Sequence, residues 1–297
     1  MALIAGEDDP PMAEVAQGRH LSLEQVADAE MAEAEFMFAF ECGAPASVRE
    51  ELGTTTVRLH GGVALAMRND PTGGYWNKAL GFGITEPVTD DVIGDILAVY
   101  RANGSGIAVL QIAPAVLPAD WADICAREGI VADSTWTKLL RPPTPPSPAH
   151  SDLRIAPVDD SEADDWAEVM RIGFEMPEGP LTAMFAGSVR SDPNFRAFAA
   201  WDGDRLVSGG LLHVKDGRAA FCGVATLPEA RNRGAQSALF VARAEAARAA
   251  GARVLSAETW RPGAGQVNPS LNNMRRAGFE PVYDRTNWVW RAPAASD

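Results

Sequence analysis

The sequence is poor in lysine and cysteine. Only three of its 26 basic residues are lysine, and together with abundant alanine this is typical of a GC-rich bacterial genome. The three cysteines, Cys42, Cys125 and Cys222, lie far apart and form no CxxC pair, so a disulfide framework is not expected. The sequence therefore predicts a protein of a reducing compartment, the cytoplasm.

Signals for metal binding, secretion and membrane insertion are also missing. The four histidines (His20, His60, His150 and His213) are scattered, without the spacing of a metal site. The N-terminus, MALIAGEDDPP, lacks a basic region followed by an apolar stretch, so no signal peptide is expected. No run of about 18 apolar residues occurs, which argues against a membrane span.

Positive charge is scarce overall. The formal net charge is −14, which argues against nucleic acid and anionic membrane surfaces as partners, because phosphate binding needs a concentrated basic face. Acidity fits a cationic or neutral partner, although it also simply keeps a protein soluble. The apolar share of 46% and the charged share of 22% are typical of a globular protein.

A stiff break divides the chain at Arg141–Ser151, RPPTPPSPAHS. Five prolines fall within Pro142–Pro148, so this stretch forms neither a helix interior nor a central strand and is predicted to be an extended linker. The chain of 297 residues is long enough for two domains. The break predicts domains at 1–141 and 152–297, joined by the linker 142–151.

The two halves end alike. The first closes with CAREGIVADSTWTKLLR and the second with MRRAGFEPVYDRTNWVWR. In each, a short helix ends at a glycine that can adopt the left-handed cap, and a Trp-containing strand follows. The two glycines, Gly129 and Gly278, are 278 − 129 = 149 residues apart. Two degenerate copies of one α/β unit explain this match.

Hydrophobic periodicity, caps and turn residues predict a similar order of elements in both halves. The first half reads as a helix Ser22–Cys42 with a Ser22/Gln25 capping box, a strand Thr55–Arg68 bent at Gly61–Gly62, its partner Tyr75–Ile84, a helix capped by Thr89, a strand Ile107–Ile112 and a helix Trp121–Glu128. The second reads as a strand Leu153–Val158, helices Ser161–Phe174 and Leu181–Val189, antiparallel strands Phe195–Trp201, Arg205–Val214 and Arg218–Thr226, a helix from about Ala235 to Ala250, a strand Arg253–Trp260, a short helix before Gly278 and a strand near Asn287–Trp290.

The segment GVATLPEARNRGAQSALF joins a strand to a helix through a basic loop. Pro228 ends the strand, Arg231 and Arg233 supply charge, and Gly234 lets the backbone approach an anion closely. The first turn of the helix offers free N–H groups and the positive end of its dipole. These parts predict a diphosphate cradle.

This loop resembles that of the GNAT acyltransferase superfamily, whose pyrophosphate loop reads Q/R-x-x-G-x-G/A. Arg231, Asn232, Arg233, Gly234 and Ala235 fit the pattern, and Gln236 replaces the small residue at its last position. A second match, NPSLNNMRRAGFEPVYDR, resembles the final helix and G-F turn of the family. The resemblance spans about Leu153–Trp290. It implies an α/β fold (α+β type) of two tandem GNAT-like domains, each a mixed, mainly antiparallel twisted sheet flanked by helices.

The resemblance implies acetyl-CoA as cofactor and CoA as product. Its pyrophosphate would lie on the loop and on Ser237, and its pantetheine arm would pair with the splayed fourth strand at Val224, Ala225 and Thr226, near Asn272 of the final helix. A backbone N–H at Val224–Ala225 would polarise the thioester carbonyl. The family often protonates the thiolate with a Tyr where this chain has Met274. The thiolate then either leaves unaided or takes its proton from another group, of which Asn272, Asn273 and Tyr283 are candidates.

Glu258 is the predicted catalytic base, because the amine must lose a proton before or as it attacks the thioester. It lies in the otherwise apolar or small strand VLSAETW. The alternative interpretation is a solvated glutamate at a strand end. His213, interpreted as a surface strand residue, and Cys222, as a small core residue, are weaker candidates. The tryptophans Trp201, Trp260, Trp288 and Trp290 are expected in the core or lining an acceptor pocket.

The first half lacks the cradle. Its equivalent junction, ITEPVTDD, contains Pro87, which has no N–H, and three acidic residues that would repel a diphosphate. This half is interpreted as a degenerate GNAT-like domain that shapes the acceptor cleft. The whole is predicted to be an N-acetyltransferase acting on a small-molecule amine, such as an amino acid, a polyamine or an aminoglycoside, with protein N-termini also open.

Two alternatives remain open at this stage: an acyl-CoA-binding protein without catalysis, and an interaction module that has lost the cofactor in both halves. The sequence also leaves open whether the chain forms a homodimer.

Overall fold

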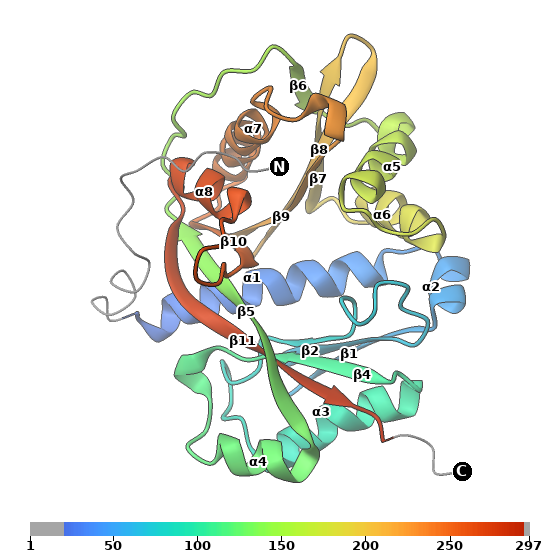
Figure 1. Cartoon of the computed structure of the whole chain (residues 1–297), viewed down its shortest axis with the longest axis vertical. Helices are drawn as coiled ribbons and strands as arrows, with labels where there is room; N and C mark the ends of the chain where they lie inside the picture. The colour runs from blue at the N-terminus through green and yellow to red at the C-terminus, as the bar shows by residue number, and fades with distance from the viewer. Residues whose placement is uncertain (1–20, 294–297) are drawn as a thin grey trace.

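One eleven-stranded sheet runs through the whole molecule in the computed structural model, which describes residues 21–293 (Figure 1). The expectation of no signal peptide concerns residues outside this range. The strands are β1 (Thr54–Leu59), β2 (Gly62–Met67), β3 (Lys78–Leu80), β4 (Ile107–Gln111), β5 (Ile130–Arg141), β6 (Arg154–Pro157), β7 (Phe195–Asp202), β8 (Arg205–Lys215), β9 (Arg218–Thr226), β10 (Val254–Trp260) and β11 (Glu280–Arg291). Their order across the sheet is β1-β2-β3-β4-β11-β5-β10-β9-β8-β7-β6.

The helices cover both faces of this sheet. They are α1 (Leu23–Cys42), α2 (Ala46–Leu52), α3 (Asp90–Asn103), α4 (Trp121–Glu128), α5 (Ala163–Gly173), α6 (Pro180–Ser191), α7 (Ala235–Ala249) and α8 (Pro269–Arg276), with short 3₁₀ turns at Pro114–Val116, Asp160–Glu162 and Pro228–Ala230. One hydrophobic cluster joins α1, α2, α5 and α6 to the sheet. A second joins α3 and α4, and a third joins α7 and α8. The mixed α/β fold with a mainly antiparallel sheet is therefore confirmed.

Local signals position several of these elements as the sequence predicts. The capping box of Ser22 and Gln25 opens α1, and the side chain of Thr89 accepts from the Val92 N–H at the start of α3. Gly129 ends α4 in the left-handed conformation, with a φ of 70°. These caps satisfy backbone groups that a helix end otherwise leaves unpaired.

The predicted bent strand Thr55–Arg68 is wrong, because the segment forms a hairpin of β1 and β2. His60 and Gly61 both have positive φ, 48° and 71°, and form the two-residue turn. Turns with two left-handed residues match the twist of a hairpin. The predicted partner strand is also shorter than expected, since it is limited to Lys78–Leu80, of which Ala79 and Leu80 pair with β2.

The two halves exchange their last strands. β5 leaves the first half to pair with β10, and β11 leaves the second half to pair with β4. The two exchanged strands pair antiparallel with each other at the centre of the sheet. The predicted pair of separate sheets is thus one continuous sheet, and each half completes the other.

Helix α1 lies across the middle of the molecule, between the part that carries α5 to α8 and the part that carries α3 and α4 (Figure 1). It contacts strands of both halves, among them β2, β3, β9 and β10. Residues 142–153, which include the Pro-rich segment, contain no helix or strand and connect β5 to β6.

Candidate active site

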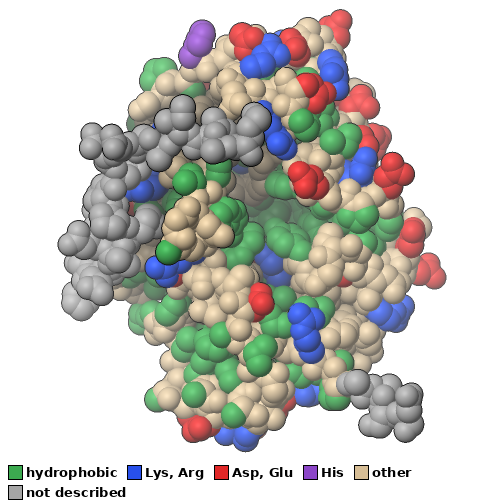
Figure 2. Space-filling model, in the orientation of Figure 1, with side chains coloured by type: hydrophobic (Ala, Val, Ile, Leu, Met, Phe, Trp, Pro, Cys, Tyr) green, Lys and Arg blue, Asp and Glu red, His purple; other side chains and the backbone are tan. Residues whose placement is uncertain are grey.

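Strands β9 and β10 splay apart. They pair in parallel only at three positions, ending at Ser256 opposite Ala220. Beyond that point β9 continues along β8, and β10 continues along β5. The face in view is hollowed near the centre of the molecule, in front of these strands, and hydrophobic side chains line the hollow (Figure 2). Among the described strands, no partner covers the facing edge of β9 from Phe221 to Thr226.

A β-bulge lies in this stretch of β9, in its pairing with β8. The register of β8 and β9 shifts so that Gly223 is an extra residue between Cys222 and Val224. Gly223 has a φ of +42°, and a Cβ there would lie 3.0 Å from the ring of Phe174. Both features favour glycine. The bulge turns the backbone of Val224, Ala225 and Thr226 at the point where the strands separate.

The loop after β9 leads into an uncapped helix start. Asn232 and Gly234 have positive φ, 64° and 78°, and α7 begins at Ala235 without a side-chain cap. The first N–H groups of a helix have no intrahelical partner and carry its positive dipole end. The N–H groups of Ala235, Gln236 and Ser237 are therefore suited to an anion.

The two loop arginines differ in their partners. Arg233 donates to Asp152 and Asp202, with closest distances of 2.6 Å to each carboxylate. These two hydrogen bonds raise its pKa and brace the loop against the linker end and the β7–β8 turn. The expectation that Arg233 charges the cradle is therefore corrected. Arg231 is exposed, and within residues 21–293 its guanidinium contacts only the Thr226 carbonyl, at 3.4 Å.

The Pro-rich segment packs against the helix start. The Ser151 hydroxyl donates to the Arg233 carbonyl at 2.8 Å, and a Cβ on Gly234 would lie 2.2 Å from the His150 carbonyl oxygen. Glycine is thus required here by the linker as well as by its φ. Linker, α7 and α8 enclose a pocket of about 270 Å³, whose polar lining includes Arg141, Ser237, Asn273 and Arg276.

Helix α8 closes the other side of this region. Asn268 caps it by accepting from the Ser270 and Leu271 N–H groups. Asn273 donates to Gln236 at 2.5 Å. Gln236, the residue that departs from the family pattern, thus connects α7 to α8. Asn272 is half-buried on the same helix.

No proton donor stands at the position of the family's Tyr. Met274 is buried with Phe240 and Phe279 in the cluster of α7 and α8. Tyr283, a predicted substitute, lies on β11 and donates to Glu30 at 2.6 Å. Burial raises the pKa of Tyr283 well above its ordinary value, with the charge of Glu30 adding to it. Tyr283 therefore belongs to a different cluster.

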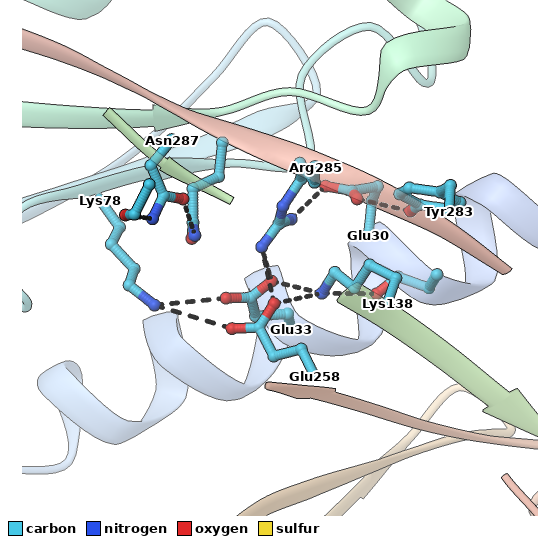
Figure 3. A network of polar contacts seen from close by, with 11 residues as sticks. Glu30, Glu33, Lys78, Lys138, Glu258, Tyr283, Arg285 and Asn287 are labelled. Carbon is cyan, nitrogen blue, oxygen red and sulfur yellow. Dashed lines mark hydrogen bonds and ion pairs between the residues drawn. The ribbon is translucent and has the colours of Figure 1, made fainter. Parts of the chain in front are cut away.

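Glu258 belongs to that cluster, a buried ion network at the junction of the halves (Figure 3). It accepts from Arg285 at 2.7 Å and lies 3.0 Å from Lys138 Nζ and 3.9 Å from Lys78 Nζ. Its side chain is 15% exposed. The interpretation of Glu258 as a solvated strand-end residue is therefore wrong. Glu258 lies two residues beyond the last β9–β10 pair, at the start of the splay.

Glu33 of α1 is the centre of the network. It accepts from Lys138 at 2.5 Å and from Arg285 at 2.6 Å, and Lys78 lies 3.4 Å away. Although burial opposes ionisation, Arg285 and the two lysines hold the pKa of Glu33 well below its ordinary value. Burial and the charge of Glu33 raise the pKa of Glu258. Glu258 is thus the more basic of the two carboxylates.

Sequence reasoning missed this network because no local pattern marks it. Its members come from α1, β3, β5, β10 and β11. One signal was present: two of the three lysines, Lys78 and Lys138, fall within predicted strands, and both are buried here. Buried lysines require carboxylate partners.

The two weaker base candidates are buried. His213 is 1% exposed and packs against Phe195, so its interpretation as a surface residue is wrong. Burial lowers the pKa of His213 to about 4 and raises the pKa of the Cys222 thiol well above its ordinary value. Both side chains are neutral in the fold near pH 7. Of the tryptophans, Trp201 and Trp290 are in the core, Trp288 is partly buried, and Trp260 is 40% exposed at the end of β10.

Arg243, like the ion network, was not predicted from the sequence. This buried α7 side chain donates to the carbonyls of Leu239 and Leu211 and lies over two phenylalanine rings. Among the described residues it contacts no carboxylate, and its Nη2 has no hydrogen-bond partner. Burial lowers the pKa of Arg243 to about 9. Leu211 pairs with Cys222, so this cation lies directly beside the β9 bulge.

In the described part of the first half, from residue 21 on, the strands show no comparable opening. Its strands β3 and β4 remain paired from Lys78 to Leu80. The helix that follows, α3, has its start capped by Thr89 and carries Asp90 and Asp91 in its first turn. Within residues 21–293, no helix is long and apolar enough to cross a membrane, and no cluster of residues has the composition of a metal site.

Comparisons with known proteins agree with this geometry. Residues 160–268 match the model of the acetyltransferase (GNAT) family. The fold is similar to that of a GCN5-related N-acetyltransferase from Kribbella flavida, with 17% identity, a TM-score of 0.55, and coverage of 86% of this chain and 96% of that one. A counterpart from Sphaerobacter thermophilus is 12% identical, with a TM-score of 0.54 and coverage of 82% and 78%.

A third solved structure has the same two-part organisation. It is a tandem GNAT protein from the clavulanic acid biosynthesis pathway, 16% identical, with a TM-score of 0.52 and coverage of 92% of this chain and 96% of that one. No curated protein matches the chain. Residues 160–268 thus match the acetyltransferase (GNAT) family model, and the fold of the chain is similar to that of a tandem GNAT protein.

Proposed function

We propose that the protein is an N-acetyltransferase that moves an acetyl group from acetyl-CoA to the amine of a small-molecule acceptor in the cytoplasm. The observation that carries the proposal is the open edge of β9, with its bulge at Gly223, placed directly before an uncapped helix start. An extended amide-containing chain can pair with such an edge, and a diphosphate can bind such a helix start.

The cofactor would be held mainly by backbone groups. The pyrophosphate would accept from the N–H groups of Ala235, Gln236 and Ser237, with Arg231 as the available cation. The pantetheine amides would pair with Val224 to Thr226. Asn232 shapes the loop through its positive φ, and Asn272 lies on the helix that closes the site. The acetyl thioester would then lie at the bulge, on the side from which Glu258 is reached.

The reaction would be direct attack of a neutral amine on the thioester carbon. A C–N bond forms, the C–S bond breaks, and the amine proton passes to Glu258, directly or through one water. A carboxylate with a raised pKa is suited to this task. The N–H of Val224 or Ala225 would stabilise the developing oxyanion. The buried cation of Arg243 beside the bulge would favour the departing thiolate. The thiolate can leave without a proton donor because it is a weaker base than an aliphatic amine, the thiol having a pKa of about 8.5 and the ammonium one of about 10.4.

The acetyltransfer proposal predicts a specific defect for Glu258→Gln. The amide keeps the size and hydrogen-bonding capacity of the carboxylate but cannot accept the proton, so kcat should fall about 10²-fold or more, the usual contribution of a general base. Release of CoA thiol in the presence of an amine panel measures kcat, and calorimetry should show acetyl-CoA affinity unchanged within about twofold. Undiminished turnover would remove Glu258 from the mechanism.

A second candidate function is binding of acyl-CoA without catalysis. Two observations favour it: Met274 is buried where the family often places a Tyr, and the Gln236–Asn273 hydrogen bond spans the region between α7 and α8. Acetyl-CoA binding without hydrolysis or transfer to any amine of the panel would support this candidate against the first.

A further inference from the structure

A second pocket, of about 230 Å³, adjoins the ion network, because Lys78 lines the pocket and belongs to the network. Strands β3, β4, β5 and β11 form it, so the strand exchange brings both halves to its walls. Its lining mixes aliphatic side chains (Ile107, Val109 and Val289) with polar, charged and aromatic ones (Tyr75, Lys78, Gln111, Asp133, Ser134, Trp136, Asn287 and Arg291). A small concave site with a few convergent polar groups is the usual form of a ligand site.

Gln111 presents an unused acceptor in this pocket. Its side chain is 1% exposed, and its Nε2 donates to Asn287 Oδ1 at 2.6 Å. Asn287 Nδ2 in turn donates to Ser134 at 2.9 Å, which fixes the orientation of both amides. Gln111 Oε1 is buried and has no partner among the described residues. A buried acceptor without a partner is unfavourable, so a donor from a ligand would be favoured there.

Lys78 presents unused donors. Its Nζ lies 3.4 Å from Glu33 and 3.9 Å from Glu258, whereas Lys138 lies at 2.5 Å and 3.0 Å from the same residues. Lys78 is thus the most loosely paired cation of the network, and an ammonium has three hydrogens. It lies 4.4 Å from the ring centre of Tyr75 and 5.6 Å from that of Trp136, at the wall of the pocket.

The side chains of Lys78 and Gln111 lie on the same side of the sheet. Leu80 pairs with Gln111, so Lys78, two residues earlier, shares the face of Gln111. The Lys78 ammonium is directed toward Glu33 and Glu258 of the network (Figure 3). A ligand bound to Lys78 would therefore lie between Gln111 and the predicted base.

We propose that this pocket binds the amine acceptor, and that the acceptor is an α-amino acid whose side chain carries a hydrogen-bond donor. Its carboxylate would accept from Lys78, its side-chain donor would bond to Gln111 Oε1, and its α-amine would face Glu258 for acetylation. The assignment of the α-amine as the reacting group rests on the acetyltransfer proposed above. The free acid is required because an amide or a simple alkylamine gives Lys78 no carboxylate.

Direct binding tests the site independently of catalysis. L-serine, L-glutamine and L-arginine would be titrated calorimetrically into the full chain, with and without saturating CoA, beside L-alanine, L-norleucine and L-glutaminamide. We expect at least one donor-bearing free acid to bind at least tenfold more tightly than alanine, norleucine and glutaminamide. Gln111→Leu should abolish this preference, and Lys78→Met should weaken all free acids at least tenfold. Lys215→Met, which removes a lysine outside the pocket, is the matched control and should leave affinities unchanged.

Equal affinity across the ligand panel, or a preference that survives Gln111→Leu, would overturn the assignment. The panel on the unaltered protein decides the question even if a variant does not fold. A parallel titration with acetyl-CoA separates the two proposals. Binding of acetyl-CoA without any amino acid overturns only the acceptor site, whereas binding of amino acids without acetyl-CoA overturns only the acetyltransfer.

Discussion

At the scale of single residues, the molecule contains ionisable groups deep in its interior, and their environments differ. Glu33 and Glu258 share three cations, Lys78, Lys138 and Arg285, so their charges are compensated. Glu41 at the end of α1 is fully buried, and neither of its carboxyl oxygens has a hydrogen-bond partner in the described part of the chain. Burial, with the charge of Asp70 adding to it, raises the pKa of Glu41 well above its ordinary value.

This predicts a pH-dependent stability that Glu41→Gln removes. A carboxyl with a raised pKa in the folded state contributes stability that is present below its ordinary pKa and is lost as the pH rises through the folded value. The variant should therefore melt at a higher temperature near pH 8, by roughly 2–4 °C for each 1 kcal/mol gained, with the difference shrinking toward about pH 4. Scanning calorimetry across this range measures it. A constant difference at all pH values would contradict the assignment.

At the scale of elements, the β9 bulge is the part of the site with the strictest backbone requirement. Gly223→Ala places a Cβ 3.0 Å from the Phe174 ring on a residue with positive φ. We expect a loss of stability of about 1–2 kcal/mol, the usual cost of left-handed backbone at a non-glycine residue.

The same substitution should lower acetyl transfer more than it lowers cofactor affinity, because in the proposed complex the bulge would position the thioester while the pyrophosphate would bind at the start of α7. Urea unfolding, calorimetry with acetyl-CoA and thiol release measure the three quantities. Gly203→Ala, at a turn where a Cβ meets nothing within 4 Å, is a control for the backbone effect alone. Unchanged turnover in Gly223→Ala would show that the bulge has no role in catalysis.

The elements also show what the sequence can and cannot predict. Caps such as Ser22 and Thr89, the glycine after α4 and the hairpin turns are local, and they placed most helices and strands to within a few residues. The segment at Gly61 was predicted as a bent strand because the alternation of residues does not reveal that His60 is also left-handed. The family resemblance predicted the splay of β9 and β10 and the start of α7, because the motif that carries the resemblance is contiguous in the sequence.

The sequence did not predict which side chains and strands from distant segments pair with one another. Arg233 fits the loop pattern of the family. Its guanidinium, however, forms ion pairs with Asp152 and Asp202, which come from two other segments. The strand exchange was equally hidden, because β5 and β11 are similar in length and composition and either could complete either sheet. Glu258 was predicted from its strand, whereas its partners Glu33 and Lys78 come from the first half.

At the scale of the whole molecule, the exchange makes the two halves interdependent. β10 lies between β9 of its own half and β5 of the other, and α1 supplies the carboxylate at the centre of the ion network. The first half therefore contributes to the proposed active site, although its own strands β3 and β4 do not separate.

Residues 152–297 alone should consequently not form a stable acetyltransferase domain. Without β5, one edge of β10 is unpaired, and without Glu30 and Glu33 the guanidinium of Arg285 loses two of its three carboxylates. Circular dichroism and acetyl-CoA titration of this fragment should show loss of cooperative unfolding and of binding. Restoration of both by adding residues 1–151 in trans would support the account. A fragment that folds and binds alone would contradict it.

The central claim is that acetyl-CoA binds with its pyrophosphate on the start of α7. Gly234 is unsuited to test it, because any side chain there meets the His150 carbonyl. Ser237 is exposed in the first turn, where an acidic residue favours the helix dipole and spares the fold. Calorimetric titration of acetyl-CoA into Ser237→Glu and its neutral match Ser237→Gln is therefore the most direct measurement. The account predicts one equivalent bound by the wild type, affinity within a few-fold of this for Ser237→Gln, and affinity at least tenfold weaker for Ser237→Glu. Equal binding by both variants, or none by the wild type, would contradict it.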